Sequence, residues 1–167
     1  MLLFFQGCAR STFNVSQSRI VGGNVAKRHS IPYQVLILIA GQSMCGGTIL
    51  NRKFVLTARH CVDSIDEFNT PPTDVSVFAG LHDVCGQTSY DGNVQKRRVK
   101  RVVVILSGEF SFVKTSFEND IALVELSEPL KFDQTVQPAC LPNSDVVSGQ
   151  LTWVSGWGRL KAGKSFH

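Results

Sequence analysis

The sequence lacks a long hydrophobic run and a strong excess of charge of either sign. Only 18% of its 167 residues are charged, and the formal net charge is +4 at pH 7. The opening "MLLFFQG" has an apolar stretch of about four residues with no basic residue before it. It is too short for a complete signal peptide, although it fits the tail of a clipped one, and far too short to span a membrane. Basic residues are scattered except at "KRRVKR", 96–101, so we expect neither a nucleic-acid nor a membrane partner.

The chain also has almost no helical periodicity. Short runs rich in Val, Ile, Leu and Phe are separated by Gly, Pro, Asn, Asp and Ser, which is typical of a β-rich domain. The runs are "PYQVLILI" (32–39), "CGGTIL" (45–50), "KFVLT" (53–57), "DVSVFA" (74–79), "RVKRVVVIL" (98–106) and "IALVEL" (121–126). They predict an all-β fold, either a small closed barrel or a sandwich. Residues 127–150 are polar and contain proline, which indicates a connector before "LTWVSGW" begins a new unit at 151.

Cysteine usage favours an oxidising, extracellular compartment. The chain has five cysteines, enough for two disulfides with one thiol left over, but their number alone does not assign the pairs. The only glycosylation sequon is "NVS" at Asn14, in a polar segment before the first apolar strand. Both features point to a secreted protein.

Two residues are candidates for acid–base chemistry. His60 ends an apolar run in "LTARHC", where it is either a satisfied core histidine or a general base. Asp120 directly precedes the apolar strand of "NDIALVEL", as either an ordinary aspartate before a strand or a buried carboxylate. A metal site at His82 and Cys85 would need further ligands at suitable spacing, and we find none, so no metal is expected.

Six ordered motifs resemble the chymotrypsin/trypsin family of serine endopeptidases. They are "RIVGG" (19–23), "CGGTIL" (45–50), "LTARHC" (56–61), "NDIALVEL" (119–126), "VQPACLP" (136–142) and "VSGWG" (154–158). The resemblance implies a trypsin-like Greek-key barrel over residues 20–126, the first of the family's two barrels. Residues 1–19 would be a propeptide or a remnant of the signal and pro region. A connector would follow over 127–150, and 151–167 would start a truncated second barrel.

The resemblance also implies a catalytic mechanism. His60 matches the base that takes the proton of a nucleophilic serine, and Asp120 matches the carboxylate that holds the imidazole in one tautomer. Cleavage between Arg19 and Ile20 by an activating protease would convert a zymogen to the active form. Protein or peptide substrates and protein inhibitors are the implied partners, with no organic cofactor.

Disulfide pairs follow from the same resemblance. Cys45 and Cys61 match the bridge that ties the histidine loop to a neighbouring strand. Cys140 matches a cysteine that in some members retains the propeptide, and Cys8 is its expected partner. Cys85 is left to pair beyond His167, to link two chains or to remain a thiol.

Three features depart from or stand outside the family pattern. No serine, including Ser107, Ser148 and Ser155, lies in a Gly-Asp-Ser-Gly-Gly setting, so we expect a truncated chain that is inactive alone. Arg59 replaces a small residue beside His60, and we expect its guanidinium either to pair with Asp120 and compete with the imidazole or to turn into solvent. The basic cluster is a processing site, a polyanion site or, as we favour, a solvated strand.

Three hypotheses therefore stand. The chain is the front part of a secreted serine endopeptidase, which we favour, or a catalytically inactive homologue that acts as a secreted binding protein. The third possibility is an unrelated β-barrel binding domain, which the six ordered motifs argue against.

Overall fold

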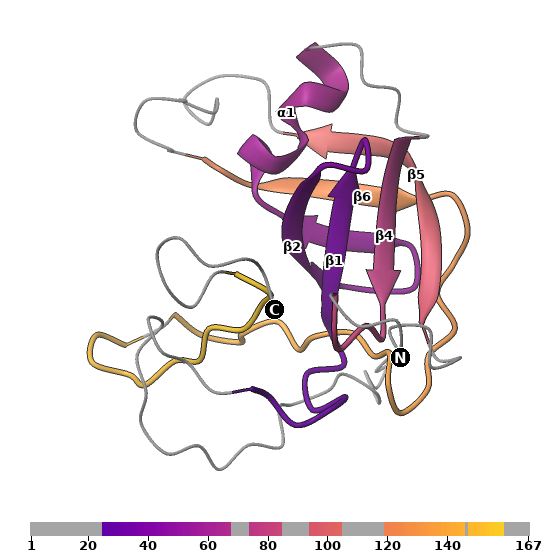
Figure 1. The fold of residues 1–167 in the computed structure, drawn as a ribbon. Coiled ribbons are helices and arrows are strands. Elements are labelled where there is room, and N and C mark those ends of the chain that lie inside the picture. The colour runs from indigo at the N-terminus through magenta and orange to yellow at the C-terminus, as the bar shows by residue number, and fades with distance from the viewer. Residues whose placement is uncertain (1–24, 68–73, 85–93, 105–118, 146, 159–167) are drawn as a thin grey trace, which may run out of the picture.

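A closed barrel of six antiparallel strands forms the centre of the computed structural model, which describes residues 25–67, 74–84, 94–104, 119–145 and 147–158 (Figure 1). One helix lies across one end of the barrel. The elements are β1 (Gln34–Ile39), β2 (Ser43–Ile49), β3 (Phe54–Thr57), α1 (Arg59–Glu67), β4 (Val75–Ala79), β5 (Gln95–Val104) and β6 (Ala122–Leu126). The all-β prediction is confirmed, with each strand at the position of one of the six apolar runs.

The strand order around the barrel is that of a Greek key. Hydrogen-bonded neighbours follow the order β1-β2-β3-β6-β5-β4, and β4 closes the ring on β1. Three consecutive strands are thus joined as hairpins, and the fourth returns to lie beside the first. The predicted barrel is therefore correct in topology, and the ring leaves no strand with an unpaired edge.

Alternating side chains of the strands fill the barrel interior. In β4, Val75, Val77 and Ala79 are fully buried, whereas the residues between them are partly exposed. Val35 and Ile37 of β1 are buried on the same interior side. Period-2 alternation of this kind is what a strand with one face on a core requires, and it explains why the sequence located these strands.

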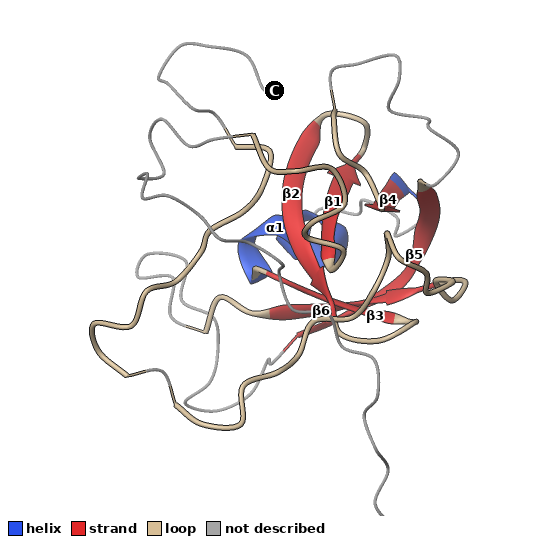
Figure 2. Ribbon diagram, turned by 90° about the horizontal axis from the view of Figure 1, so that it is seen from below, coloured by secondary structure: helices blue, strands red, loops and turns tan. Residues whose placement is uncertain are grey.

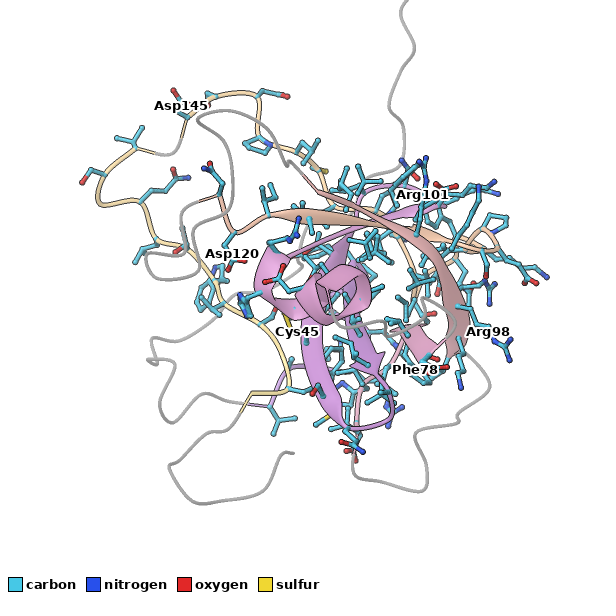
Figure 3. The ribbon with its side chains drawn as sticks, turned by 90° about the horizontal axis from the view of Figure 1, so that it is seen from above. Cys45, Phe78, Arg98, Arg101, Asp120 and Asp145 are labelled. Carbon is cyan, nitrogen blue, oxygen red and sulfur yellow. A yellow bond between two sulfur atoms is a disulfide. The ribbon has the colours of Figure 1, made fainter. Side chains whose placement is uncertain are left out.

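A β-bulge in β5 gathers two cations around one carboxylate. The pairing of β5 with β6 shifts register between Val99 and Arg101. Lys100 Nζ lies 2.9 Å from Glu125 Oε1, and the Arg101 guanidinium bonds Glu125 Oε2. Consecutive side chains of a regular strand point to opposite faces, so the bulge is what lets both reach the same carboxylate. Figure 3 shows Arg98 and Arg101 on the side of the barrel away from Asp120.

The first part of the predicted connector packs back on the barrel. Leu130 and Val136 are fully buried in the core. The main-chain N–H of Leu130 donates to Arg52 O at 2.7 Å, and that of Ala139 donates to Ile49 O at 2.8 Å. Residues 127–140 therefore cover the barrel.

Apolar side chains are exposed farther along, where the chain runs beside the barrel (Figures 1 and 2). The exposed residues in this stretch are Leu141, Val147, Leu151, Trp153 and Val154. The segment is attached again near its end, where Ser155 Oγ donates to Gln34 Oε1 and Trp157 Nε1 donates to His82 O, each at 2.8 Å. Over the described ranges, no helix is both long and apolar enough to cross a membrane.

Two adjacent glycines of β2 should respond differently to alanine. A Cβ at Gly47 would lie 2.8 Å from Val55 Cγ1 and 3.0 Å from Val35 Cγ2, inside the packed barrel. We expect Gly47→Ala to lower the free energy of unfolding by about 1–3 kcal/mol through overpacking. Gly46→Ala is the matched control, because its Cβ would meet only the end of the flexible Gln34 side chain, at 3.2 Å. Urea unfolding of both variants measures the difference, and equal effects would contradict this account of the packing.

The Glu125 cluster should make stability depend on pH. Hydrogen bonds from Lys100 and then Arg101 lower the pKa of Glu125 from 4.5 to about 2. A lowered carboxyl pKa stabilises the fold above the unfolded value, and this stabilisation is lost as pH falls through the folded value. Between pH 4.5 and about 2, we expect the free energy of unfolding to fall less steeply in Glu125→Gln than in the unsubstituted chain. Urea titrations at several pH values test this, with exposed Glu128→Gln as control, and parallel curves for Glu125→Gln and the parent would refute it.

Candidate active site

His60 lies in the first turn of the short helix α1, directly after strand β3. Thr57 ends β3, and its hydroxyl donates to Gly46 O of β2 at 2.8 Å. The helix begins at Arg59, and its buried face carries Val62 and Ile65. This packing holds the helix against the barrel end, while the His60 side chain remains 50% exposed.

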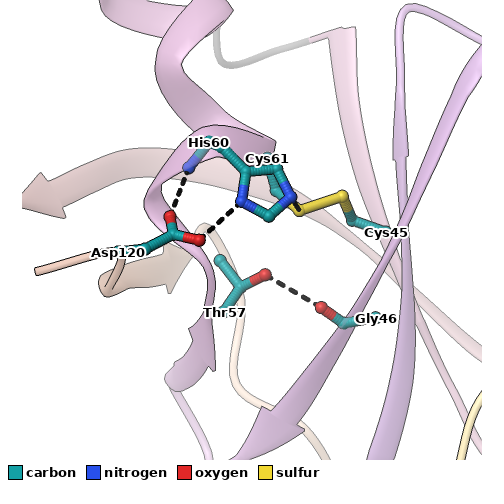
Figure 4. The surroundings of a disulfide bond; sticks show 6 residues. All are labelled: Cys45, Gly46, Thr57, His60, Cys61 and Asp120. Atoms are coloured by element: carbon teal, nitrogen blue, oxygen red, sulfur yellow. Dashed lines mark hydrogen bonds and ion pairs between the residues drawn. A yellow bond between two sulfur atoms is a disulfide. The ribbon is translucent and has the colours of Figure 1, made fainter. Parts of the chain in front are cut away.

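The pairing register of β3 with β6 brings Asp120 next to the first turn of α1. Thr57 of β3 pairs with Ala122 of β6, so the residues just after Thr57 and just before Ala122 leave the barrel together. Asn119 adopts a left-handed conformation with φ of 56°, which asparagine tolerates better than most residues, and this turns the chain into β6. The carboxyl of Asp120 therefore faces the first turn of α1 (Figure 4).

The Asp120 carboxylate accepts hydrogen bonds from both the ring and the main chain of His60. Nδ1 of the ring lies 2.6 Å from Oδ2, and the main-chain N–H donates to Oδ1 at 2.8 Å. Burial alone would raise the pKa of Asp120. The hydrogen bonds and charge of His60, with a smaller contribution from the nearby main-chain N–H of Arg59, outweigh this effect, so the pKa of Asp120 lies below its ordinary value of 3.8. The carboxyl is thus ionised at neutral pH.

An ionised carboxylate fixes the tautomer of the neutral imidazole. Because a carboxylate only accepts hydrogen bonds, Nδ1 must carry the proton, which places the ring's lone pair on Nε2. The structure thus brings together the two residues that the sequence selected for acid–base chemistry, although they are 60 positions apart. The arrangement can take up a proton at Nε2 and stabilise the imidazolium that forms.

The predicted Cys45–Cys61 disulfide is confirmed. It joins β2 to α1, and Cys61 Sγ lies 3.6 Å from His60 Nε2 (Figure 4). Ligand atoms of Cys45, His60 and Cys61 lie within 4.8 Å of one another, a spacing that a metal ion could use. Both sulfurs are consumed in the disulfide, however, so neither is a thiolate ligand, and the three residues do not fit a metal ion.

Both expectations for Arg59 are wrong. Its side chain neither pairs with Asp120 nor turns into solvent, because Arg59 is only 5% exposed and its Nε bonds Asp63 Oδ1. Asp63 was not among the site residues predicted from the sequence. The signal was present, since opposite charges four residues apart face each other on a helix, but it required recognising that α1 is a helix.

The remaining predicted site residues are described only in part. Cys140 is disulfide-bonded. Cys8, Asn14, Arg19, Ile20 and Cys85 lie outside the described residues, so the Cys8–Cys140 pair, the glycosylation site and the activation site stay predictions.

Comparison with known proteins identifies the class. A family model described as Trypsin matches residues 20–167, and the chain therefore belongs to the trypsin family. This membership supports the assignment to the serine proteases.

Two curated relatives match most of the chain. Coagulation factor IX of Cavia porcellus is 35% identical over 146 residues, which cover 85% of this chain and 47% of that protein. Serine protease filzig of Drosophila melanogaster is 34% identical over 163 residues, covering 90% of this chain and 9% of that protein. The chain thus spans less than half the length of each of these relatives.

Removing the disulfide should loosen the turn that carries His60. Cys45 and Cys61 are 16 positions apart, and closing a loop of about that length stabilises a fold by about 3 kcal/mol. We expect the Cys45→Ser/Cys61→Ser chain to lose stability of this order in urea unfolding. Faster hydrogen exchange at the His60 amide should accompany the loss. A double variant with unchanged stability and unchanged exchange would show that the bridge does not hold the site.

Proposed function

We propose that these residues supply the histidine and aspartate of a serine endopeptidase. The observation that carries the proposal is the pair of bonds from His60 to Asp120, 2.6 Å from Nδ1 and 2.8 Å from the main-chain N–H. In this proposal Asp120 holds the imidazole in the Nδ1–H tautomer. Nε2 of His60 takes the proton of an attacking serine hydroxyl and later returns it to the leaving amine.

The nucleophile is the missing component. None of the serines of the 167 residues lies in a Gly-Asp-Ser-Gly-Gly setting, and the oxyanion donors of the family adjoin that serine. We infer that the serine belongs to a segment outside this sequence and that these residues alone do not cleave peptides. Protein substrates and protein inhibitors, activation by cleavage between Arg19 and Ile20, and an extracellular site of action complete the proposal.

The second candidate is an inactive homologue that works by binding. It is favoured by the exposed apolar side chains of Leu141, Val147, Leu151, Trp153 and Val154, because a soluble monomer rarely leaves such groups uncovered together. In this case the His60–Asp120 pair would be retained as structure only.

A nuclear magnetic resonance experiment on the chain tests the pair first. With histidines labelled by ¹⁵N, His60 should appear as the Nδ1–H tautomer with a strongly downfield Nδ1 proton, which Asp120→Asn removes. His60→Gln assigns the signal among the four histidines of the chain. A ring without this tautomer in the unsubstituted chain would refute the proposed base.

Activity is then tested by complementation. The chain is co-expressed with the C-terminal part of a trypsin-family protease that carries Gly-Asp-Ser-Gly-Gly, and hydrolysis of fluorogenic peptide amides is measured. We expect activity that falls roughly 10⁴-fold in Asp120→Asn, because the wrong tautomer is then favoured. Activity unaffected by His60→Ala would contradict the assignment. A stable but inactive complex would favour the binding protein.

A further inference from the structure

A buried ion pair lies directly beside the proposed catalytic pair. Arg59 and Asp63 are one turn apart on α1 and are 5% and 7% exposed, with Arg59 Nε bonded to Asp63 Oδ1. Charged side chains are almost never this deeply buried unless they are paired. The two residues thus form a unit of zero net charge inside the first turns of the helix.

This ion pair is a poor device for stability alone. Arg59 Nη1 is buried and has no hydrogen-bond partner among the described residues. Removing two charges from water is costly, and apolar side chains of similar volume often stabilise a fold as well as or better than such a pair does. An incompletely satisfied pair at this position therefore calls for a role other than packing.

The position of Arg59 suggests that role. The main-chain N–H of His60 donates to Asp120 Oδ1 at 2.8 Å, so the first turn of α1, which begins at Arg59, is fastened to Asp120. A guanidinium is also the strongest side-chain competitor for a carboxylate, because it can bind both oxygens at once. A released Arg59 side chain would therefore be a rival to the His60 ring.

We propose that the Arg59–Asp63 ion pair positions the His60–Asp120 pair. Asp63 binds the guanidinium and keeps it from Asp120, and the pair fixes the turn in which the His60 main-chain N–H donates to the Asp120 carboxylate. Arg59 and Asp63 are thus positioning residues and touch no substrate. The inference rests on the proposed function of His60 and Asp120.

Substitutions in the full 167-residue chain test this by the same His60 signal. Asp63→Asn should release Arg59 and abolish or at least halve the downfield Nδ1–H signal, with loss of the single tautomer. Arg59→Met/Asp63→Asn should restore the signal, because no guanidinium remains to compete. Glu125→Gln is the matched control. It also breaks an ion pair of a carboxylate that is 8% exposed, but the partner Arg101 lies on the side of the barrel away from Asp120 (Figure 3), so the signal should be unchanged.

Each outcome bears on the proposal. Retention of the signal in Asp63→Asn, or its loss in the double variant as well, would overturn the inference, because a role in packing alone predicts no rescue. If Asp63→Asn does not fold, Arg59→Met decides. It should keep the ring signal while the main-chain amide of His60, which donates to Asp120, exchanges about tenfold faster. Unchanged exchange, or loss of the ring signal, would overturn the inference.

The two proposals fail in distinguishable ways. Absence of the signal in the unsubstituted chain would overturn both. A signal that Asp120→Asn abolishes but Asp63→Asn leaves intact would overturn only the role of Arg59 and Asp63.

Discussion

The Asp120 carboxylate joins the start of strand β6 to helix α1 at the candidate site. Asp120 accepts both the ring Nδ1–H and the main-chain N–H of His60. The N–H groups at the start of a helix have no partners within the helix, and here a residue just before a distant strand satisfies that of His60. The contact that fixes the imidazole therefore also caps the helix that carries it.

The barrel is what makes this contact possible. His60 and Asp120 are brought together by the pairing of Thr57 with Ala122, and a shift of one residue would turn every side chain of β6 to the other face. Buried Val55 and Val124 lie opposite each other in the same ladder, so the hydrophobic core specifies that register. The geometry of the site thus depends on apolar packing that makes no contact with the imidazole.

Much of the fold was predictable because the barrel strands alternate or are continuously apolar. Helix α1 was missed, since its nine residues offer only Val62 and Ile65 as buried apolar positions, too few to show a helical period. The polar start of β5 was missed for a similar reason, because Gln95, Lys96 and Arg97 carry no apolar signal although they pair with β4. The His60–Asp120 pair was predicted from the family resemblance, whereas no property of the two residues in isolation distinguished them from ordinary ones.

The charges around His60 could not be predicted from the sequence, because they depend on where the Arg59 side chain lies. A cation directly beside a base that must become positively charged would oppose the proton transfer, and it would also attract the carboxylate on which the base depends. Asp63 removes both difficulties within one helical turn, because the ion pair presents no net charge and holds the guanidinium inside the helix packing. The basic residues of β5 need no such arrangement, since Lys100 and Arg101 both pair with Glu125, and Arg101 lies on the side of the barrel away from Asp120 (Figure 3). A basic side chain therefore affects the His60–Asp120 pair only where it lies close to Asp120, as Arg59 does. The closed barrel sets that distance and keeps Arg101 of β5 on the other side.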